Sequence, residues 1–267
     1  MDSLYIVMPA YNEEANIEGV VRQWYPVLAG KSEASRLVIA DSGSNDRTHE
    51  VLENLQKEFP QLEILPDTNR YHGPKVIALY DLAIKRGIDY VFQTDSDGQT
   101  NPDEFDAFWQ MRNEYDGIFG NRTVRGDGKG RAFVEKVVCL LLRLYFGVKV
   151  PDANAPFRLM KCDVVKKYLY KMQEDYNLPN IMMTTYYAYF NEKQAFRPIS
   201  FKPRTAGKNS VNFRNIDVRS AETKCLIADY LRRSIFPDLI HRLAKCINFS
   251  QVIITCGDIC HRNTYLI

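Results

Sequence analysis

LYIVMPAYNEE, residues 4–14, joins a short apolar run to a polar turn. An apolar run of this length that ends in turn residues is typical of a buried strand. Runs of the same kind follow at residues 36–40, 62–65, 90–94 and 117–120. Amphipathic patterns of helical period separate them, at residues 15–28, 46–59, 75–86 and 102–112. This alternation predicts an α/β fold with right-handed βαβ crossovers and a mostly parallel sheet that helices cover on both faces.

The second half of the chain carries a less regular pattern. Loops are expected at residues 122–132, rich in glycine and arginine, and at residues 203–212. Helical patterns occupy residues 133–146, 164–173, 179–191 and 219–247, and a strand pattern occupies residues 195–202. A kink is expected at Pro237, because proline removes a helical hydrogen bond. We therefore expect one α/β domain, residues 1–215, followed by a helical tail, residues 216–267.

Charge is unevenly distributed along the chain. The 267 residues hold 35 Lys and Arg against 33 Asp and Glu, a net charge of +2, which excludes a generally basic nucleic-acid-binding protein. Residues 1–196 carry 23 basic and 28 acidic side chains, whereas residues 197–267 carry 12 and 5. In the tail, apolar residues recur at near-helical spacing between arginines and lysines. Such a helix either lies on an anionic membrane surface or packs its apolar side on the α/β domain.

Signals for export or membrane insertion are not evident in the sequence. Residues 1–3 lead into the first strand without a basic signal-peptide region, and no stretch reaches the ~18 apolar residues of a spanning helix. The six cysteines form no small-domain disulfide framework, and Cys256 and Cys260 with His261 are weak evidence for a metal site. The expected location is cytoplasmic, peripheral on the cytoplasmic face of a membrane.

Polar residues follow the strands at the carboxyl ends, where open parallel sheets bind ligands. The clearest group is Asp95-Ser96-Asp97-Gly98-Gln99, directly after residues 90–94. Two carboxylates one residue apart can hold a divalent cation, and oxygen ligands favour Mg²⁺ or Mn²⁺ bridging to substrate phosphates. The alternative is a solvated turn, with Asn101 or Asp103 capping the next helix. The position at a strand end, together with two other polar strand ends, favours the metal site.

Asp41 ends the second strand, where its carboxylate can accept hydrogen bonds from a nucleobase or ribose. Asp46 is expected to cap the helix that follows. The phosphate-binding pattern G-x-x-x-x-G-K-[ST] is absent, and no G-x-G-x-x-G follows the first strand, so a P-loop kinase or a Rossmann dehydrogenase is disfavoured. Neither a G-x-S-x-G elbow nor the spacing of the four histidines indicates a catalytic nucleophile.

A second group of candidate residues is cationic. Guanidinium and ammonium groups in loops are suited to binding phosphate oxygens. The candidates are Arg122, Arg131, Arg158, Arg204 and Lys208. Each alone is more commonly a surface charge, but Arg131 and residues 204–208 both lie in loops that contain glycine. We therefore expect these residues to contribute to a phosphate-binding region.

The polar motifs at the ends of the first, second and fourth strands, taken in sequence order, resemble those of the inverting family 2 glycosyltransferases, which have a GT-A fold. The shared motifs are MPAYNEE at 8–14, D-x-GS-x-D-x-T at 41–48 and D-x-DGQ at 95–99. Three later segments look like the branch that transfers sugars to dolichyl or polyprenyl phosphate: GNR at 120–122, DANAPFR at 152–158 and PRTAGKNS at 203–210. The resemblance covers residues 4–215. Ser42 departs from it, where the family commonly has a second Asp, and so do residues 154–156, which replace the usual Thr/Ser-Gly.

The resemblance implies a function for each matching residue. Those that would bind the donor nucleotide are Pro9, Tyr11, Glu13, Asp41, Lys75 and Ser96. Asp95, Asp97 and Gln99 would hold Mg²⁺ or Mn²⁺ on the diphosphate. Arg122 and Arg131 would act in catalysis together with the two aspartates. Those that would bind acceptor or donor phosphates are Arg131, Arg158, Arg204 and Lys208.

The implied reaction is direct displacement at the anomeric carbon of a UDP- or GDP-linked sugar, with the metal offsetting charge on the departing diphosphate. A polyprenyl phosphate acceptor is already anionic and needs only positioning. A sugar hydroxyl, as in surface polysaccharide or glycolipid synthesis, needs a general base, for which Glu174 and Asp175 are candidates. The basic loop at residues 204–208 favours the lipid phosphate and a membrane-surface location.

Two alternatives differ in class. A sugar-phosphate nucleotidyltransferase of the same fold would carry a glycine-rich, basic signature directly after the first strand, which residues 11–14 lack. A degenerate module that only binds nucleotide sugars is the non-enzymatic alternative. The intact pair Asp95 and Asp97 counts against that module.

Overall fold

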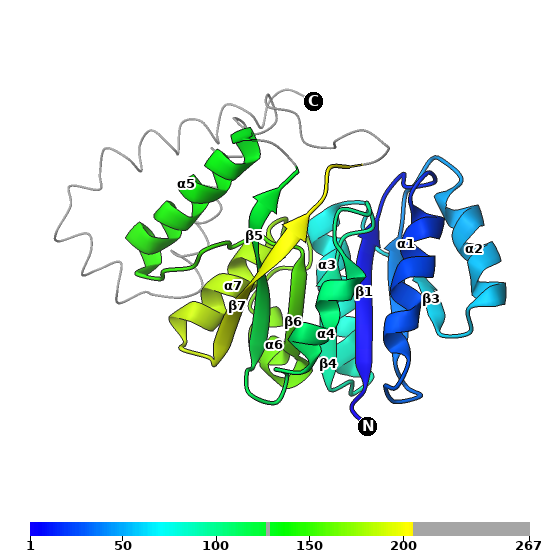
Figure 1. Ribbon diagram of the computed structural model, residues 1–267, viewed down its shortest axis with the longest axis horizontal. Coiled ribbons are helices and arrows are strands. Elements are labelled where there is room, and N and C mark those ends of the chain that lie inside the picture. Colours follow the sequence, from blue (N-terminus) through cyan, green and yellow to red (C-terminus); the bar gives the residue numbers. More distant parts are fainter. Residues whose placement is uncertain (127–128, 205–267) are drawn as a thin grey trace. The chain divides into compact units, whose positions relative to one another are not determined.

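The computed structural model describes residues 1–126 and 129–204 (Figure 1). The strands are β1 (Leu4–Ala10), β2 (Arg36–Asp41), β3 (Leu62–Leu65), β4 (Tyr90–Thr94), β5 (Gly117–Arg125), β6 (Phe157–Lys161) and β7 (Gln194–Phe201). The helices are α1 (Ile17–Trp24), α2 (Thr48–Glu58), α3 (His72–Lys85), α4 (Phe105–Trp109), α5 (Lys129–Phe146), α6 (Cys162–Leu169) and α7 (Pro179–Tyr189), with 3₁₀ turns η1 (Tyr25–Leu28) and η2 (Pro102–Glu104). The predicted tail, residues 216–267, and Lys208 lie outside the described residues, so the boundary at residue 215 stays a prediction.

The strands form one seven-stranded sheet in the order β3-β2-β1-β4-β6-β5-β7. β1 pairs in parallel with β2 and β4, β2 with β3, and β5 with β7. Only β6, among the described strands, runs antiparallel to its neighbours β4 and β5. The mostly parallel sheet is therefore confirmed. The strand β6 was not predicted, because charged residues at 158 and 161 interrupt its apolar run.

Helices cover both faces of the sheet (Figure 1). Apolar residues of α1, α2 and α4 join those of β1, β2 and β4 in one core cluster. At its centre Trp24 lies 5.3 Å from the Phe92 ring and 5.9 Å from the Phe157 ring, measured between centroids. On the other face α3 packs against β1, α6 and α7. Cover on both faces explains why every residue of β1 and β4 is buried and why these strands appear in the sequence as nearly continuous apolar runs.

Several element boundaries differ from the prediction, and the helix expected at residues 164–173 already ends at Leu169. The helix expected at residues 15–28 ends as an α-helix at Trp24 and continues as a 3₁₀ turn, because Pro26 supplies no backbone N–H. The helix expected at residues 102–112 is reduced to η2 and the short α4. The long loop expected at residues 122–132 is largely regular structure, since β5 continues to Arg125 beside β7 and α5 begins at Lys129.

Candidate functional site

The carboxyl ends of β1 and β4 meet where the order of the strands reverses. From β1 the chain proceeds outward to β2 and β3, and it then forms β4 on the opposite side of β1. Ligands bind to α/β sheets at such a switch point, beyond the carboxyl ends of the strands. The turn after β1, Asp41 at the end of β2 and residues 95–99 after β4 all lie at this edge.

The turn after β1 is held by hydrogen bonds to the neighbouring strand ends. The Ser96 hydroxyl donates to the Pro9 carbonyl over 2.8 Å. Asn12, with a φ of 55°, accepts a hydrogen bond from the Asn45 N–H at 2.8 Å. Tyr11 projects from this turn with 43% of its surface exposed. An exposed aromatic ring on a fixed turn is suited to stacking against a nucleobase.

Lys75 reaches the same turn from the first part of α3. Its ammonium donates to the Ala10 carbonyl and lies 5.4 Å from the centroid of the Tyr11 ring. Burial lowers the pKa of Lys75 to about 8, although the nearby carboxylate of Asp41 opposes this shift. A buried cation beneath the exposed ring of Tyr11 gives this part of the edge a preference for anionic ligands.

Asp41 is buried at the end of β2. One of its oxygens accepts a hydrogen bond from the Ser44 hydroxyl at 2.5 Å, and the other lies 3.3 Å from Nδ1 of His49. The predicted capping residue Asp46 accepts a hydrogen bond from the N–H of Thr48, the first residue of α2, at 3.0 Å. The turn after β2 is thus a network of short side chains around one buried carboxylate.

Glu13 and Arg204 form an ion pair that joins the turn after β1 to the segment after β7. The other carboxylate oxygen of Glu13 accepts a hydrogen bond from the Asn16 side chain at 2.7 Å. Burial raises the pKa of Glu13, while the bonds from Asn16 and Arg204 oppose the rise. Both carboxylate oxygens of Glu13, a predicted nucleotide ligand, are therefore occupied by contacts within the protein. Through the ion pair, Glu13 holds the Arg204 guanidinium near Asp97.

Asp95 and Asp97 lie on the loop directly after β4, as the sequence predicted. Asp95 has His72 Nε2 and Gln93 Nε2 at 3.3 Å from its Oδ1. Burial, together with the neighbouring charge of Asp95, raises the pKa of Asp97 to about 6. Two partly buried carboxylates that repel each other in this way favour the approach of a cation.

Gln99 tethers this loop to the end of β7. Its side-chain amide donates to the Lys202 carbonyl at 2.7 Å, and the Lys202 N–H donates to the Gln99 carbonyl at 2.8 Å. The Gln99 N–H in turn donates to Oδ1 of Asp97 at 3.1 Å. The expectation that Gln99 is a metal ligand finds no support in this geometry, because its side chain bridges two loops inside the protein.

The donor set that the loop offers fits a small divalent cation. Within residues 1–126 and 129–204, no group of three or more His, Cys, Asp or Glu side chains converges as a complete metal cage. Mg²⁺ and Mn²⁺ sites that act on phosphates need only one or two carboxylates, since phosphate oxygens and waters complete the coordination. Asp95 and Asp97 supply that pair, and burial with the charge of Asp95 raises the pKa of Asp97 although Arg204 opposes the rise, so a cation bound between the two carboxylates would relieve their repulsion.

Arg122 lies in a buried ion-pair cluster. Its guanidinium donates to both carboxylate oxygens of Asp152, over 2.7 and 2.8 Å, and to Glu135 on α5 over 3.3 Å. The Glu135 carboxylate also accepts a hydrogen bond from the Ala153 N–H at 2.7 Å. Arg122 is therefore already neutralised by carboxylates, and its position favours a structural link between β5 and α5 over phosphate binding. Arg131 lies in the first turn of α5.

Arg158 corrects the sequence-based prediction. It is fully buried in β6, and its guanidinium donates to the carbonyls of Ala153, Ala155 and Asn180 and to the Thr184 hydroxyl. Burial lowers its pKa. A guanidinium enclosed by backbone carbonyls has no free face for a phosphate, so the position of Arg158 favours a structural role over acceptor binding.

The candidate bases Glu174 and Asp175 are exposed in the loop between α6 and α7. The next part of that loop packs on the start of α3, because a Cβ on Gly73 would lie 2.3 Å from the Tyr176 carbonyl oxygen and 2.6 Å from Cα of Asn177. Gly73 adjoins His72, which contacts Asp95. The loop that carries the two acids therefore borders the switch-point edge.

His72 is the main residue of this edge that the sequence did not indicate. It begins α3, three residues before Lys75, and its Nε2 lies 3.3 Å from Asp95. The spacing of histidines along the chain does not reveal this contact, because it joins the start of α3 to the loop after β4. The pattern HGPK at the start of a helix, next to a predicted anion-binding lysine, was the available signal.

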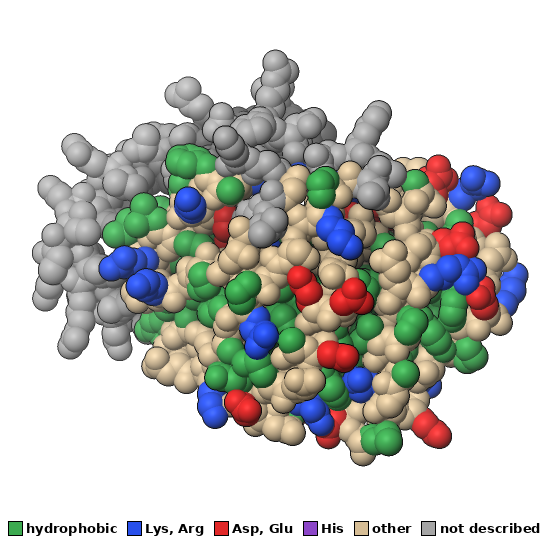
Figure 2. All heavy atoms as spheres, in the orientation of Figure 1, with side chains coloured by type: hydrophobic (Ala, Val, Ile, Leu, Met, Phe, Trp, Pro, Cys, Tyr) green, Lys and Arg blue, Asp and Glu red, His purple; other side chains and the backbone are tan. Residues whose placement is uncertain are grey.

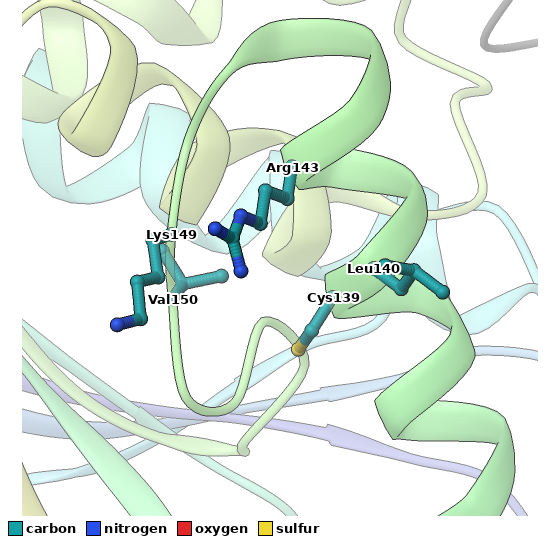
Figure 3. Close-up of a pocket in the computed structure, with 5 residues that line it drawn as sticks. All are labelled: Cys139, Leu140, Arg143, Lys149 and Val150. Carbon is teal, nitrogen blue, oxygen red and sulfur yellow. The ribbon is translucent and has the colours of Figure 1, made fainter.

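A shallow hollow lies away from this edge (Figure 3). It has a volume of about 180 Å³ and is lined by Cys139, Leu140, Arg143, Lys149 and Val150, on α5 and the segment after it. None of these residues belongs to the candidate site, and the convergence of charged groups at the switch point is the stronger indication of chemistry. No helix in the described part of the chain has the length and apolar character needed to cross a membrane.

Known protein families and proteins of similar sequence include sugar-transferring enzymes, the class of protein that the site at the switch-point edge also suggests. The sequence pattern of glycosyl transferase family 2 matches residues 5–169. A similar protein is undecaprenyl-phosphate 4-deoxy-4-formamido-L-arabinose transferase of Pseudomonas aeruginosa, 26% identical over 170 residues, which are 63% of this chain and 50% of that protein. Another is the succinoglycan biosynthesis protein ExoA of Rhizobium meliloti, 35% identical over 104 residues, which are 39% of this chain and 30% of that protein. The chain spans about half the length of the transferase it matches.

Solved structures show the same fold at low sequence identity. Glucosyl-3-phosphoglycerate synthase of Mycobacterium tuberculosis in complex with UDP has a TM-score of 0.58 and 18% identity, over 89% of this chain and 82% of the other. TarS of S. aureus in complex with UDP-GlcNAc has a TM-score of 0.58 and 15% identity, over 89% and 68%. These likenesses confirm the predicted GT-A-type fold.

Proposed function

The chain belongs to glycosyl transferase family 2, and we propose that it transfers a sugar, with inversion, from a UDP- or GDP-linked donor to a polyprenyl phosphate. The observation that carries this proposal is the meeting of Asp95 and Asp97 with Arg204 and Lys75 at one sheet edge. The matched transferase acts on undecaprenyl phosphate, and glucosyl-3-phosphoglycerate synthase was crystallised with Mn²⁺ and UDP-glucose, which supports the same chemistry here.

In this proposal Tyr11 and Asp41 bind the nucleoside, and Lys75 attracts the diphosphate. Asp95 and Asp97 would hold Mg²⁺ or Mn²⁺, which when bound supplies Lewis-acid stabilisation of the departing nucleoside diphosphate. Arg204, held by Glu13, adds a positive charge beside the same group. The acceptor phosphate attacks the anomeric carbon directly, and as an anion it needs no general base.

One experiment tests donor, metal and acceptor together. The full chain is incubated with UDP- and GDP-sugars and Mn²⁺, with and without a polyprenyl phosphate, and the labelled sugar is measured in the lipid extract and as free sugar. Lipid-linked sugar that requires Mn²⁺ supports the proposal. If the donor is hydrolysed to free sugar and adding polyprenyl phosphate yields no lipid-linked sugar, polyprenyl phosphate is not the acceptor. The absence of both transfer and hydrolysis favours a binding module.

A sugar hydroxyl is the second candidate acceptor, and the packing of residues 176–177 on Gly73 favours it. This contact brings the loop of Glu174 and Asp175 to the border of the site, where a general base would be needed. The double substitution Glu174→Gln and Asp175→Asn separates the two acceptors. If the double variant still transfers sugar to lipid phosphate, the lipid phosphate is supported as the acceptor. If it binds the donor but no longer turns over, the sugar hydroxyl is supported instead.

A further inference from the structure

Helix α5 carries large apolar side chains on its exposed side. Phe133, Leu140 and Leu144 are 67%, 54% and 70% exposed, and Val137 is also exposed. These four residues recur every three or four positions, so they share one side of the helix. We refer to Phe133, Val137, Leu140 and Leu144 as the α5 stripe. Soluble proteins expose single apolar residues routinely, but a continuous row of them marks an interaction surface.

The opposite side of α5 fixes the direction in which the stripe points. Leu142 is buried and packs with Val150 and Ile181. Glu135, two turns earlier on the same side, pairs with Arg122 of β5 over 3.3 Å. Since Glu135 and Leu142 hold the helix against the rest of the domain, the α5 stripe faces away from the core.

Basic residues border the stripe. Lys136 and Arg143 are exposed and follow Phe133 and Leu140 by three positions each, so they lie beside the stripe along one edge. Figure 2 shows hydrophobic and basic side chains gathered over α5, and Figure 3 shows Arg143 and Lys149 on neighbouring segments. The sole acidic residue of α5 is Glu135, whose charge is paired with Arg122 on the inner side.

We propose that α5 is an interfacial helix that docks this protein on an anionic lipid bilayer. The α5 stripe enters the boundary between head groups and acyl chains, and Lys136 and Arg143 contact lipid phosphates. This inference rests on the proposed function, since a polyprenyl phosphate is reached only at a bilayer. Docking through α5 brings the same domain that holds the site to the surface where such an acceptor lies.

Charge distinguishes the bilayer from the other possible occupants. Helix α5 carries Lys129, Arg131, Lys136 and Arg143 against one acid, and residues 205–267 carry nine basic and five acidic side chains. Residues 205–267 therefore carry a net positive charge, as α5 does. A second copy would also bring an identical basic border against Lys136 and Arg143. An anionic bilayer is the partner of opposite charge.

The position of α5 connects the docking surface to the site. α5 follows β5 in the chain, and Arg122 of β5 binds its Glu135. β5 pairs with β7, whose end leads to Lys202 and then to Arg204 beside Asp97. The helix and the loop of the metal-binding aspartates are thus attached to the same strands.

Vesicle flotation of the full chain tests the proposal without donor or acceptor. Vesicles of phosphatidylcholine with about one third phosphatidylglycerol are the probe, and pure phosphatidylcholine is the comparison. The triple substitution Phe133→Ser, Leu140→Ser and Leu144→Ser should weaken flotation at least about tenfold, because it removes the buried apolar area. Tyr170→Ser, at a similarly exposed aromatic residue on another surface, should float like the parent. Equal flotation of the triple variant and the parent overturns the proposal.

A local measurement removes the dependence on any second membrane contact. Leu144→Trp should be quenched by brominated phosphatidylcholine in anionic vesicles, whereas Tyr170→Trp should not. Equal quenching at the two positions, or none at Leu144→Trp, contradicts docking through α5. A parent that does not float but forms dimers, which the triple substitution dissociates, assigns the stripe to a second copy instead. Failure of sugar transfer with retained flotation would contradict the proposed function alone.

Discussion

Burial acts in opposite directions on two ionisable side chains of the site. It raises the pKa of Asp97 to about 6, with help from Asp95, and lowers the pKa of Lys75 to about 8. Both groups are therefore mainly charged between these two values. A donor diphosphate that needs a cation on Asp97 and an ammonium at Lys75 should bind best in that interval.

Replacing Asp97 by a neutral residue should increase the stability of the protein and remove its function. Its pKa rises from 3.8 to about 6 on folding, so the folded chain binds the proton more tightly, and this contribution to stability is lost as pH rises through about 6. Asp97→Asn removes the charge, and we expect unfolding in urea at pH 7.5 without metal to require about 1 kcal/mol more. The same variant should lose the stabilisation that Mn²⁺ with UDP gives the parent. Asp103→Asn, an exposed neighbour, should change neither quantity.

The protonation of Lys75 should determine how donor binding depends on pH above neutrality. As pH rises through about 8, the ammonium loses its proton and its attraction for the diphosphate. We expect UDP affinity, measured by calorimetry with Mg²⁺ at pH 7 and pH 9, to fall by about tenfold in the parent. Lys75→Met should bind weakly at both pH values, and the exposed Lys57→Met should follow the parent. The same pH dependence in Lys75→Met would contradict the assignment.

Arg158 should matter for stability and not for ligand binding. Its guanidinium satisfies three backbone carbonyls and the Thr184 hydroxyl inside the protein. Arg158→Met leaves these acceptors without donors, and we expect a loss of about 3 kcal/mol in the free energy of unfolding by urea. Arg47→Met, at an exposed arginine, is the control. A stable Arg158→Met protein that no longer uses the acceptor would restore the phosphate-binding prediction.

At the scale of elements, the start of α3 and the loop before α7 form one unit through Gly73. A Cβ at this position would meet the Tyr176 carbonyl oxygen at 2.3 Å, which the backbone cannot accommodate without moving. Gly73→Ala should therefore displace residues 174–177, destabilise the protein and reduce turnover. Gly19 in α1 has no atom within 4 Å of the same added group. Gly19→Ala should instead stabilise by about 0.5–1 kcal/mol in urea unfolding, with activity unchanged. Normal turnover in Gly73→Ala would show that this loop does not shape the site.

The predictability of each element followed from how its residues are buried. β1, β2 and β4 are buried along nearly their whole length, so their apolar runs were evident in the sequence. β6 carries Arg158 into the interior, and a buried charge looks like a surface residue in the sequence. Pro26 marked the end of α1, but the pattern of apolar residues continued through it.

The site was predictable where chain order determines position. The loops of Asp41 and Asp95 follow parallel strands, so their meeting at one edge required only the alternation of strands and helices. The partners of individual side chains were not predictable, because they depend on contacts between distant segments. Gln99 meets Lys202 and Glu13 meets Arg204, over separations of 103 and 191 residues along the chain. Those contacts decide which predicted ligands face the site.

At the scale of the whole molecule, the two parts of the sequence differ in charge. Residues 1–196 have a net charge of −5 and residues 197–267 one of +7. Within the acidic part α5 is an exception, because four of its five charged residues are basic. The proposed transferase therefore combines an acidic nucleotide-binding edge, which needs a cation, with separate basic segments that suit an anionic surface.

Ionic strength should separate these two charge systems. At about 0.05 M salt the fields of exposed lysines and arginines extend beyond 10 Å, whereas at about 0.5 M they are largely screened. Transfer to polyprenyl phosphate in anionic vesicles should fall at least about tenfold between these conditions, since it requires docking. In the proposed site, Mn²⁺-dependent donor hydrolysis would take place at the partly buried Asp95 and Asp97, so its rate should change less than about twofold. Lys136→Glu with Arg143→Glu should already show the high-salt behaviour at low salt, while Lys57→Glu with Lys166→Glu, which changes the net charge equally, should not. A parallel decline of transfer and hydrolysis with salt would mean that the basic segments act on the donor and not on the membrane surface.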